Sequence, residues 1–323
     1  MNSYNVGIIG LGGMGRVMLA DMAKHDQFTV TVAWDPDPDR CEDTRRQYTD
    51  LRISADAAGL INDDAINLLY VASPPSSHRE YFLAAIDAEL PVFCEKPFGV
   101  DVAESVDLLA RIENAGLSNS INFNHGNALG STHIESQLRD GTMGKIAGVD
   151  VFVHLSQWPR DFQQAAAWLA RREQGGFTRE MLSHWLYLTR RLLGEGSITR
   201  AHVIYPDDGI SSETHLTAEL EFSGIKLFIR AATGGAGPVG TEYTIWGTEK
   251  SFRLHSGGRI STSDGGPWTP EFANLKDIGD QDRQSALDGV VSCLTSEPNN
   301  MPTAADGYAV QKLIEGLLTY RNG

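Results

Sequence analysis

Two stretches of the sequence carry residues whose types and spacing could do chemistry. Gly10, Gly12 and Gly15 fit G-x-G-x-x-G directly after an apolar run, a pattern typical of backbone that approaches a pyrophosphate. Lys96 follows another apolar run, where a partly desolvated ammonium could exchange protons near neutral pH. Together these residues indicate dinucleotide binding combined with proton transfer.

The glycine loop opens a helix and has an acidic residue at a suitable distance. Gly13 and Met14 belong to the helix N-terminus, which supplies amide donors and a partial positive charge for phosphates. Asp35 lies 20 residues after Gly15, at the end of the second apolar run, where a carboxylate would accept from both ribose hydroxyls. Asp35 therefore favours NAD over NADP, although Arg40 could offset its charge; we interpret Arg40 as a solvated helix residue. A ligand-free glycine turn and a methyltransferase loop are the alternatives.

The elements that must position these residues alternate in the first half of the chain. Apolar runs at 6–9, 29–34, 67–72, 91–94 and 118–123 predict strands, with helical stretches between them, the first following the glycine loop through about 24 and the others at about 40–48, 78–88 and 102–114. This alternation predicts an α/β Rossmann domain with a doubly wound parallel sheet over residues 1–123.

The rhythm changes after residue 123. Helices are expected at about 131–140, 162–173, 177–193, 280–296 and 304–320, and strands at 146–156, 216–222, 225–231, 242–247 and 251–255. Ser223-Gly224 suits a hairpin turn between two of these strands. Residues 124–323 are therefore predicted to form an α+β domain with an open, mostly antiparallel sheet.

Composition excludes several classes of protein. The 323 residues carry 27 Lys+Arg and 42 Asp+Glu, a net charge of −15, which argues against nucleic-acid and anionic-membrane binding. The apolar runs are too short to span a bilayer. Cys41, Cys94 and Cys293 read as free thiols, and residues 1–4 carry no export signal, so a cytoplasmic location is expected. The remaining histidines show no ligand spacing, and no metal site is assigned.

Three motifs together resemble the Gfo/Idh/MocA oxidoreductases, which include glucose–fructose oxidoreductase and inositol dehydrogenase. The motifs are the glycine loop, Ser73-Pro74-Pro75-x-x-His78 and Glu95-Lys96-Pro97. The resemblance implies that Lys96 touches substrate and nicotinamide, that Glu95 helps to place it, and that a cis bond precedes Pro97. It also assigns a second group of residues to cofactor binding, namely Ser73, Pro74, His78, Glu95 and Lys96.

The second half carries the other motif of that family. Gly175-Gly176 is followed by Glu180 and by His184, and a spacing of four puts these two side chains on one helix face. The resemblance implies that His184 exchanges the proton of a substrate hydroxyl while hydride moves to or from nicotinamide, and that Lys96 holds the developing oxyanion. A structural helix histidine is the alternative. Glu180 stands where many relatives have Asp, and Tyr187 stands where an Asp is common, so we do not assume inositol or glucose as substrate.

Further residues are expected to contact substrate. Trp158 could stack on a sugar ring or pack in the core, and Arg160 or Arg179 could bind a carboxylate. Asn124 and His125 follow the last Rossmann strand, with a structural role for His125 as the alternative. The substrate-binding set is therefore Asn124, His125, Trp158, Arg160, Glu180 and Tyr187.

The sequence thus predicts an NAD(P)-dependent enzyme acting on a secondary alcohol or ketone of a sugar, cyclitol or related polyol. Reduction of an imine or semialdehyde is one rival, and a non-catalytic dinucleotide sensor on the same scaffold is another. The strand near 149–155 carries Phe152 and His154 on the face opposite its apolar side, so a second subunit is expected to cover that face. A homodimer or homotetramer follows from that expectation.

Overall fold

The computed structural model describes residues 3–321 and divides into two compact units. The first unit is the chain up to Phe123 together with Ala286–Gln311, and the second is Asn124–Ser285 together with the chain from Lys312 onward. The sequence-based prediction placed all of 124–323 in the second domain, whereas the structure groups 286–311 with the first. No helix within residues 3–321 is long and apolar enough to cross a membrane.

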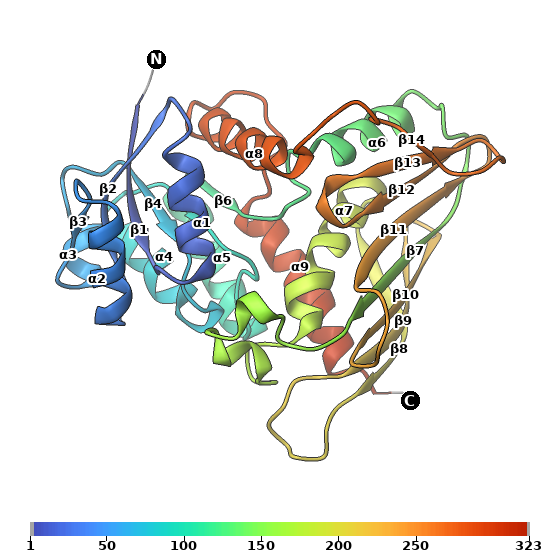
Figure 1. The fold of residues 1–323 in the computed structure, drawn as a ribbon, viewed down its shortest axis with the longest axis horizontal. Coiled ribbons are helices and arrows are strands. Elements are labelled where there is room, and N and C mark those ends of the chain that lie inside the picture. Colours follow the sequence, from blue (N-terminus) through green and yellow to red (C-terminus); the bar gives the residue numbers. More distant parts are fainter. Residues whose placement is uncertain (1–2, 322–323) are drawn as a thin grey trace. The chain divides into compact units, whose positions relative to one another are not determined.

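The first unit is a six-stranded parallel sheet in the order β3-β2-β1-β4-β5-β6 (Figure 1). Its strands are β1 (Tyr4–Ile9), β2 (Phe28–Trp34), β3 (Arg52–Ile53), β4 (Leu68–Val71), β5 (Val92–Cys94) and β6 (Asn119–Ile121). Its connecting helices are α1 (Gly13–Met22), α2 (Pro38–Gln47), α3 (Ala57–Ile61), η1 (Pro75–Ser77), α4 (His78–Asp87) and α5 (Val102–Ala115). The strand order reverses between β1 and β4, so this Rossmann sheet has a topological switch point at the carboxyl ends of those strands.

The segment 286–311 joins the first unit because it shares that unit's core and backbone hydrogen bonds. Leu287 and Val290 of α8 (Ile278–Leu294) pack in one buried cluster with residues of β1, α1 and β4. The N–H of Ile121 donates to Pro302 O at 2.7 Å, which continues the edge of β6. The hydrophobic periodicity predicted the two C-terminal helices, but it did not predict that residues 286–311 pack with the first unit.

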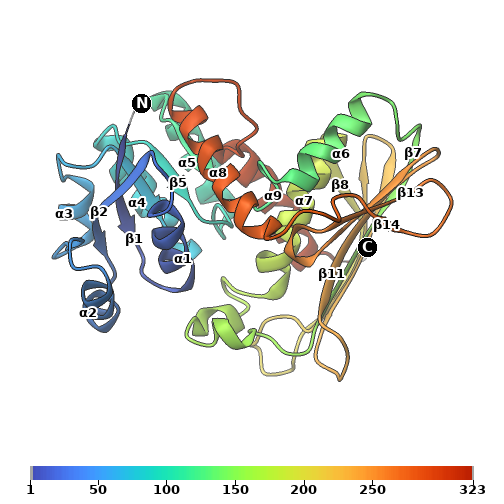
Figure 2. The same cartoon turned by 45° about the horizontal axis from the view of Figure 1, so that its top comes forward.

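The second unit is an eight-stranded sheet in the order β14-β13-β12-β11-β7-β10-β9-β8 (Figure 1). Figure 2 shows its strands β7, β8, β11, β13 and β14 from a second direction. Its strands are β7 (Ile146–Leu155), β8 (Gly196–Ile204), β9 (His215–Phe222), β10 (Ile225–Thr233), β11 (Gly240–Gly247), β12 (Ser251–His255), β13 (Ile260–Ser263) and β14 (Thr269–Pro270). Only the β7–β10 pair is parallel among these described strands. Ser223 and Gly224, both with positive φ, make the predicted hairpin turn between β9 and β10.

The helical segments of the second unit differ from prediction in two places. They are α6 (Leu129–Arg139), η2 (Asp161–Gln163), η3 (Ala167–Ala170), η4 (Thr178–Leu182), α7 (Ser183–Leu193) and parts of α8 and α9 (Ala304–Leu318). The predicted helix over 162–173 is wrong, because only short 3-10 turns form there and Phe162 is 72% exposed, which leaves no continuous apolar face to bury. The predicted helix over 177–193 begins as the π-helix η4.

Candidate functional site

The glycine loop of the first unit has the geometry its motif predicts. Gly10 has a φ of +97°, and a Cβ there would lie 2.7 Å from the backbone of Ala72, which follows β4. A Cβ on Gly15 would lie 1.8 Å from Gly10 O, so α1 can approach β1 only with glycine at this position. Gly12 is the N-cap of α1 and Met14 is 42% exposed. The first turn of α1 therefore presents backbone amides beside a loop in which Gly10 and Gly15 have no room for a Cβ, whereas Gly13 has open space.

Asp35 is buried at the end of β2 and is tied to the same loop. Its Oδ2 accepts from the N–H of Leu11 at 2.7 Å, and its Oδ1 accepts from the N–H of Asp37 at 2.9 Å. Arg40 places Nη1 3.6 Å from Asp35 Oδ2 and Nε 3.4 Å from Asp37 Oδ2. The interpretation of Arg40 as a merely solvated residue is therefore wrong, because the guanidinium is paired beside the glycine loop.

His78 plays a different part from the one predicted. The imidazole is fully buried, with Nδ1 3.0 Å from Pro97 O and Nε2 2.9 Å from Ser73 O. Burial lowers the pKa of His78. Both ring nitrogens lie against protein carbonyls, and a neutral ring has one N–H, so His78 donates to one carbonyl at a time. The buried ring packs the loop after β4 against the turn after β5. Ser73, by contrast, accepts through Oγ from Ser77 at the start of that loop.

Lys96 lies on the turn that follows β5, and its acidic neighbour is firmly anchored. Glu95 Oε1 accepts from Tyr70 Oη at 2.6 Å and from Asn122 Nδ2 at 2.6 Å, with both Glu95 and Lys96 buried. Burial raises the pKa of Tyr70 well above its ordinary value, so the phenol remains a donor. The Lys96–Pro97 bond is cis, as the resemblance implied. Tyr70 and Asn122 were missed from the sequence. Because β4, β5 and β6 are neighbouring parallel strands, residues near their carboxyl ends lie beside Glu95, and this pairing could have identified both residues.

The Gly175-Gly176 pair allows close packing beneath η4 in the second unit. A Cβ on Gly176, where φ is +103°, would lie 2.4 Å from Glu213 Oε2. Glu213 is 1% exposed and accepts from the N–H of Thr178 at 2.7 Å. Burial raises the pKa of Glu213. Glu213 was missed from the sequence, because it lies more than 30 residues from the Gly175-Gly176 pair along the chain.

Glu180 forms a polar cluster with two residues of the preceding loop. Its Oε1 accepts from Gln163 Nε2 at 2.9 Å and lies 3.4 Å from Arg160 Nη2, while Arg160 Nε donates to Gln163 Oε1 at 2.8 Å. The structure thus brings the predicted residues Arg160 and Glu180 together. Gln163 completes the cluster and was missed, because the sequence placed it inside a continuous helix.

His184 lies in the first turn of α7 and meets the chain that follows β6. Its Nδ1 accepts from the backbone N–H of Asn124 at 3.2 Å. His125 stacks at 4.4 Å on Trp185, and its Nδ1 lies 3.0 Å from Ser131 Oγ. Burial, with the nearby Arg191 charge, lowers the pKa of His125 to about 3, so this ring is neutral under physiological conditions. His125 therefore fits the structural alternative.

Three other candidates are engaged in packing or internal bonds. Arg179 donates to Glu315 Oε1 at 2.6 Å and Oε2 at 2.7 Å, so the suggestion that it binds a substrate carboxylate is wrong. Trp158 donates through Nε1 to Leu169 O at 2.9 Å, and Tyr187 is only 4% exposed. These contacts favour structural roles for Trp158 and Tyr187.

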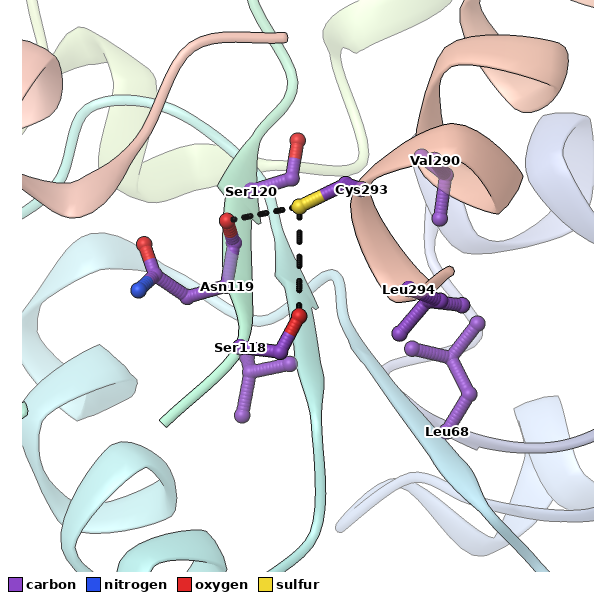
Figure 3. Close-up of a pocket in the computed structure, with 8 residues that line it drawn as sticks. Leu68, Ser118, Asn119, Ser120, Val290, Cys293 and Leu294 are labelled. Atoms are coloured by element: carbon purple, nitrogen blue, oxygen red, sulfur yellow. Dashed lines mark hydrogen bonds between the residues drawn. The ribbon is translucent and has the colours of Figure 1, made fainter. Parts of the chain in front are cut away.

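A small pocket in the first unit is lined by apolar side chains, serines, an asparagine and one cysteine, without a charged side chain (Figure 3). It is lined by Leu68, Val92, Ser118, Asn119, Ser120, Val290, Cys293 and Leu294. Cys293 Sγ lies 3.6 Å from Asn119 O, and burial raises the pKa of its thiol. This pocket is a packing gap between β6 and α8. Within the described residues, no group of three potential metal ligands gathers.

Two family models match most of the chain. Residues 4–123 match the model described as "Oxidoreductase family, NAD-binding Rossmann fold", and residues 132–253 match the model described as "GFO/IDH/MocA C-terminal domain". These ranges correspond to the glycine-loop unit and to most of the second unit.

Individual relatives are more distant. The chain is 26% identical over 195 residues to 2,7-anhydro-N-acetylneuraminate hydratase of Escherichia coli, covering 59% of this chain and 50% of that protein. It is 23% identical over 211 residues to levoglucosan dehydrogenase of Pseudarthrobacter phenanthrenivorans, covering 62% and 54% respectively. These matches span about half the length of those relatives. A solved structure of levoglucosan dehydrogenase with NADH superposes with a TM-score of 0.85 at 18% identity, covering 98% of this chain and 96% of that one, which establishes the shared fold.

Proposed function

Since the chain belongs to the Gfo/Idh/MocA oxidoreductases, we propose that it is an NAD(P)-dependent dehydrogenase or reductase acting on a secondary alcohol or ketone. The proposed substrate class is a sugar, cyclitol or related polyol. The names of relatives, which include levoglucosan dehydrogenase and inositol 2-dehydrogenase, support this class. The observation that carries the proposal is the buried Lys96 on the turn after β5, in the same unit as a glycine loop and an anchored Asp35.

The residues of the first unit fit a dinucleotide. Gly12 and Gly13 carry no side chains and a Cβ on Gly13 would meet nothing within 4 Å, so a pyrophosphate can approach the amides of Gly12, Gly13 and Met14 at the start of α1. Asp35 accepts two backbone N–H groups, and an ionised carboxylate has about four acceptor sites, which leaves capacity for ribose hydroxyls. When bound, the cofactor would accept or return a hydride at its nicotinamide ring. Because of Asp35, we expect NAD to bind more tightly than NADP.

Lys96, on the first unit, and His184, on the second, are the proposed catalytic residues. Glu95 is held in place by hydrogen bonds from Tyr70 and Asn122. It would keep the backbone at Lys96 in position and place a carboxylate near the Lys96 side chain. In the second unit, Arg160 and Glu180 provide a guanidinium and a carboxylate suited to polyol hydroxyls. The exposed side chain of Asn124 joins this substrate-binding set.

The test is steady-state oxidation of a panel of polyols by the wild type and by Lys96→Met. General acid–base catalysis contributes roughly 100- to 10,000-fold, so turnover should fall about 1,000-fold in the variant. The dissociation constant for NADH, measured by fluorescence titration, should stay within about threefold, since the glycine loop and Asp35 are unchanged. Equal turnover in Lys96→Met would remove the assigned role.

A homodimer or homotetramer is proposed from one face of the second sheet. Val149, Val151 and Val153 of β7 point to the buried face, whereas Phe152 and Phe228 on the other face are 43% and 50% exposed. A sheet face with exposed aromatic residues is typical of a subunit interface. Sizing with light scattering at micromolar concentration should give a dimer or tetramer, and Phe228→Glu should shift it toward monomer. A monomeric wild type would contradict this proposal.

A cytoplasmic location is also proposed. The thiols of Cys41, Cys94 and Cys293 are free, which suits a reducing compartment.

A further inference from the structure

A closed set of contacts joins Asp35, Asp37 and Arg40 where β2 passes into α2. Asp35 Oδ1 accepts from the N–H of Asp37 at 2.9 Å, Asp37 Oδ2 lies 3.4 Å from Arg40 Nε, and Arg40 Nη1 lies 3.6 Å from Asp35 Oδ2. All three residues belong to the first unit. One guanidinium therefore lies between two carboxylates, and the positive charge is outnumbered.

The start of α2 fixes this arrangement. Asp37 is the N-cap residue of α2, where its Oδ1 accepts from the N–H of Asp39 at 3.0 Å, and Pro38 begins the helix. Because residues three apart are neighbours on a helix surface, the first turn brings Arg40 beside Asp37. The Asp37 carboxylate thus caps the helix with one oxygen and contacts the guanidinium with the other.

Arg40 also lies beside the glycine loop. A Cβ on Gly12 would lie 3.5 Å from Arg40 Nη1, and Asp35 Oδ2, which faces that Nη1, accepts from the N–H of Leu11. The proposed function assigns Asp35 to the ribose hydroxyls of the cofactor. A phosphate on the 2′-oxygen of that ribose, as in NADP, would therefore lie next to Arg40, and a guanidinium is well suited to bind phosphate.

The two carboxylates differ in how they affect such a phosphate. The Asp35 side chain is 3% exposed and is anchored by two backbone N–H groups, so it stays in place whichever cofactor binds. The Asp37 side chain is 44% exposed and the Arg40 side chain is 34% exposed, so a ligand can reach both. Asp37 offsets the charge of Arg40 and also repels an incoming phosphate.

We propose that Asp37 is a specificity-determining residue, which weakens NADP binding by neutralising Arg40. Without the Asp37 charge, Arg40 binds the 2′-phosphate. This inference rests on the proposed function for the place of the ribose, and it is independent of which polyol is oxidised. It assigns the preference for NAD to two carboxylates rather than to Asp35 alone.

The test is fluorescence titration of the full-length protein with NADPH and with NADH. Asp37→Asn removes the charge and keeps a capping side chain, because Asn and Asp are about equally good N-cap residues. Since exposed charge pairs have modest energies, the Kd for NADPH should fall about fivefold, and that for NADH should change less than about twofold. Asp39→Asn is the matched control, because it removes the same charge from the same turn and leaves the contact between Asp37 and Arg40 in place.

Two further measurements separate attraction by Arg40 from general electrostatics. Adding Arg40→Gln to Asp37→Asn should abolish the gain for NADPH, and raising salt from about 50 to about 500 mM should reduce the gain, since salt screens exposed charges. Equal effects of Asp37→Asn and Asp39→Asn on the Kd for NADPH would overturn the proposal, as would a gain that survives Arg40→Gln.

These outcomes are distinct from failure of the proposed function. If the wild type binds NADH and oxidises no polyol, the proposed function is defeated and the titrations still decide the role of Asp37. A wild type that binds neither NADH nor NADPH would overturn both.

Discussion

The two units build their candidate sites from different material. In the first unit the site is largely backbone: glycines without side chains, the amides that open α1, and a carboxylate held by two N–H groups. In the second unit the site is built from side chains, with Glu180 fixed by Gln163 and Arg160. A backbone site is specified by a short local motif, whereas a side-chain site depends on partners that the chain supplies from elsewhere.

The largest expected effect comes from breaking the backbone site. Gly15→Ala would put a Cβ 1.8 Å from Gly10 O, which only a backbone shift can relieve. We expect the free energy of unfolding to fall by about 4 kcal/mol, measured by urea denaturation. Gly13→Ala is the matched control, because a Cβ there meets nothing within 4 Å and should leave stability nearly unchanged. Similar losses in the two variants would contradict the account of the loop.

A slightly smaller effect should follow from breaking the scaffold of the side-chain site. Arg179 is 6% exposed and forms a bidentate pair with Glu315, so Arg179→Met leaves a carboxylate without its partner. The expected loss is about 3 kcal/mol in the free energy of unfolding. Adding Glu315→Met in the same chain should recover part of that loss. If Arg179→Met instead changes only KM, Arg179 binds substrate and its structural role is contradicted.

The smallest effect concerns pH and sharpens the role of His125. Its pKa is lowered to about 3 in the folded chain, so below about pH 6.5 the unfolded state binds a proton that the folded state does not. Its contribution to stability is therefore lost as pH falls from about 6.5 toward 3. Between pH 7.5 and 5 the wild type should lose about 2 kcal/mol more than His125→Gln. Parallel pH dependence in the two proteins would show that His125 titrates normally.

The sequence predicted the backbone site of the first unit better than the side-chain site of the second. The Rossmann order, the glycine loop, Asp35 and the turn at Lys96 were accessible, because strand ends and turns are encoded by residues close in sequence. The partners of these residues were not. His78 matched a family motif, yet its ring nitrogens lie against Ser73 O and Pro97 O, contacts that only the packed loops reveal. Arg179 was likewise a candidate for binding a substrate carboxylate, but it pairs with Glu315, which is distant along the chain.

The second unit was predicted less completely for physical reasons. Residues 162–173 contain helix-compatible side chains, but little of that segment is buried, so tertiary contacts decide its short turns. The short edge strands β13 and β14 depend on pairing with β12 rather than on their own pattern. Residues 286–311 pack into the core of the first unit through tertiary contacts, which the hydrophobic periodicity of the segment does not predict.

The central claim is that Lys96 acts on the reacting oxygen of the substrate. The most direct measurement is a crystal structure of the protein with NAD⁺ and a polyol that it oxidises. The account predicts Lys96 Nζ within about 3.2 Å of the reacting hydroxyl oxygen, which is hydrogen-bond reach for proton transfer. A bound polyol whose reacting hydroxyl lies out of reach of Lys96 Nζ would contradict it.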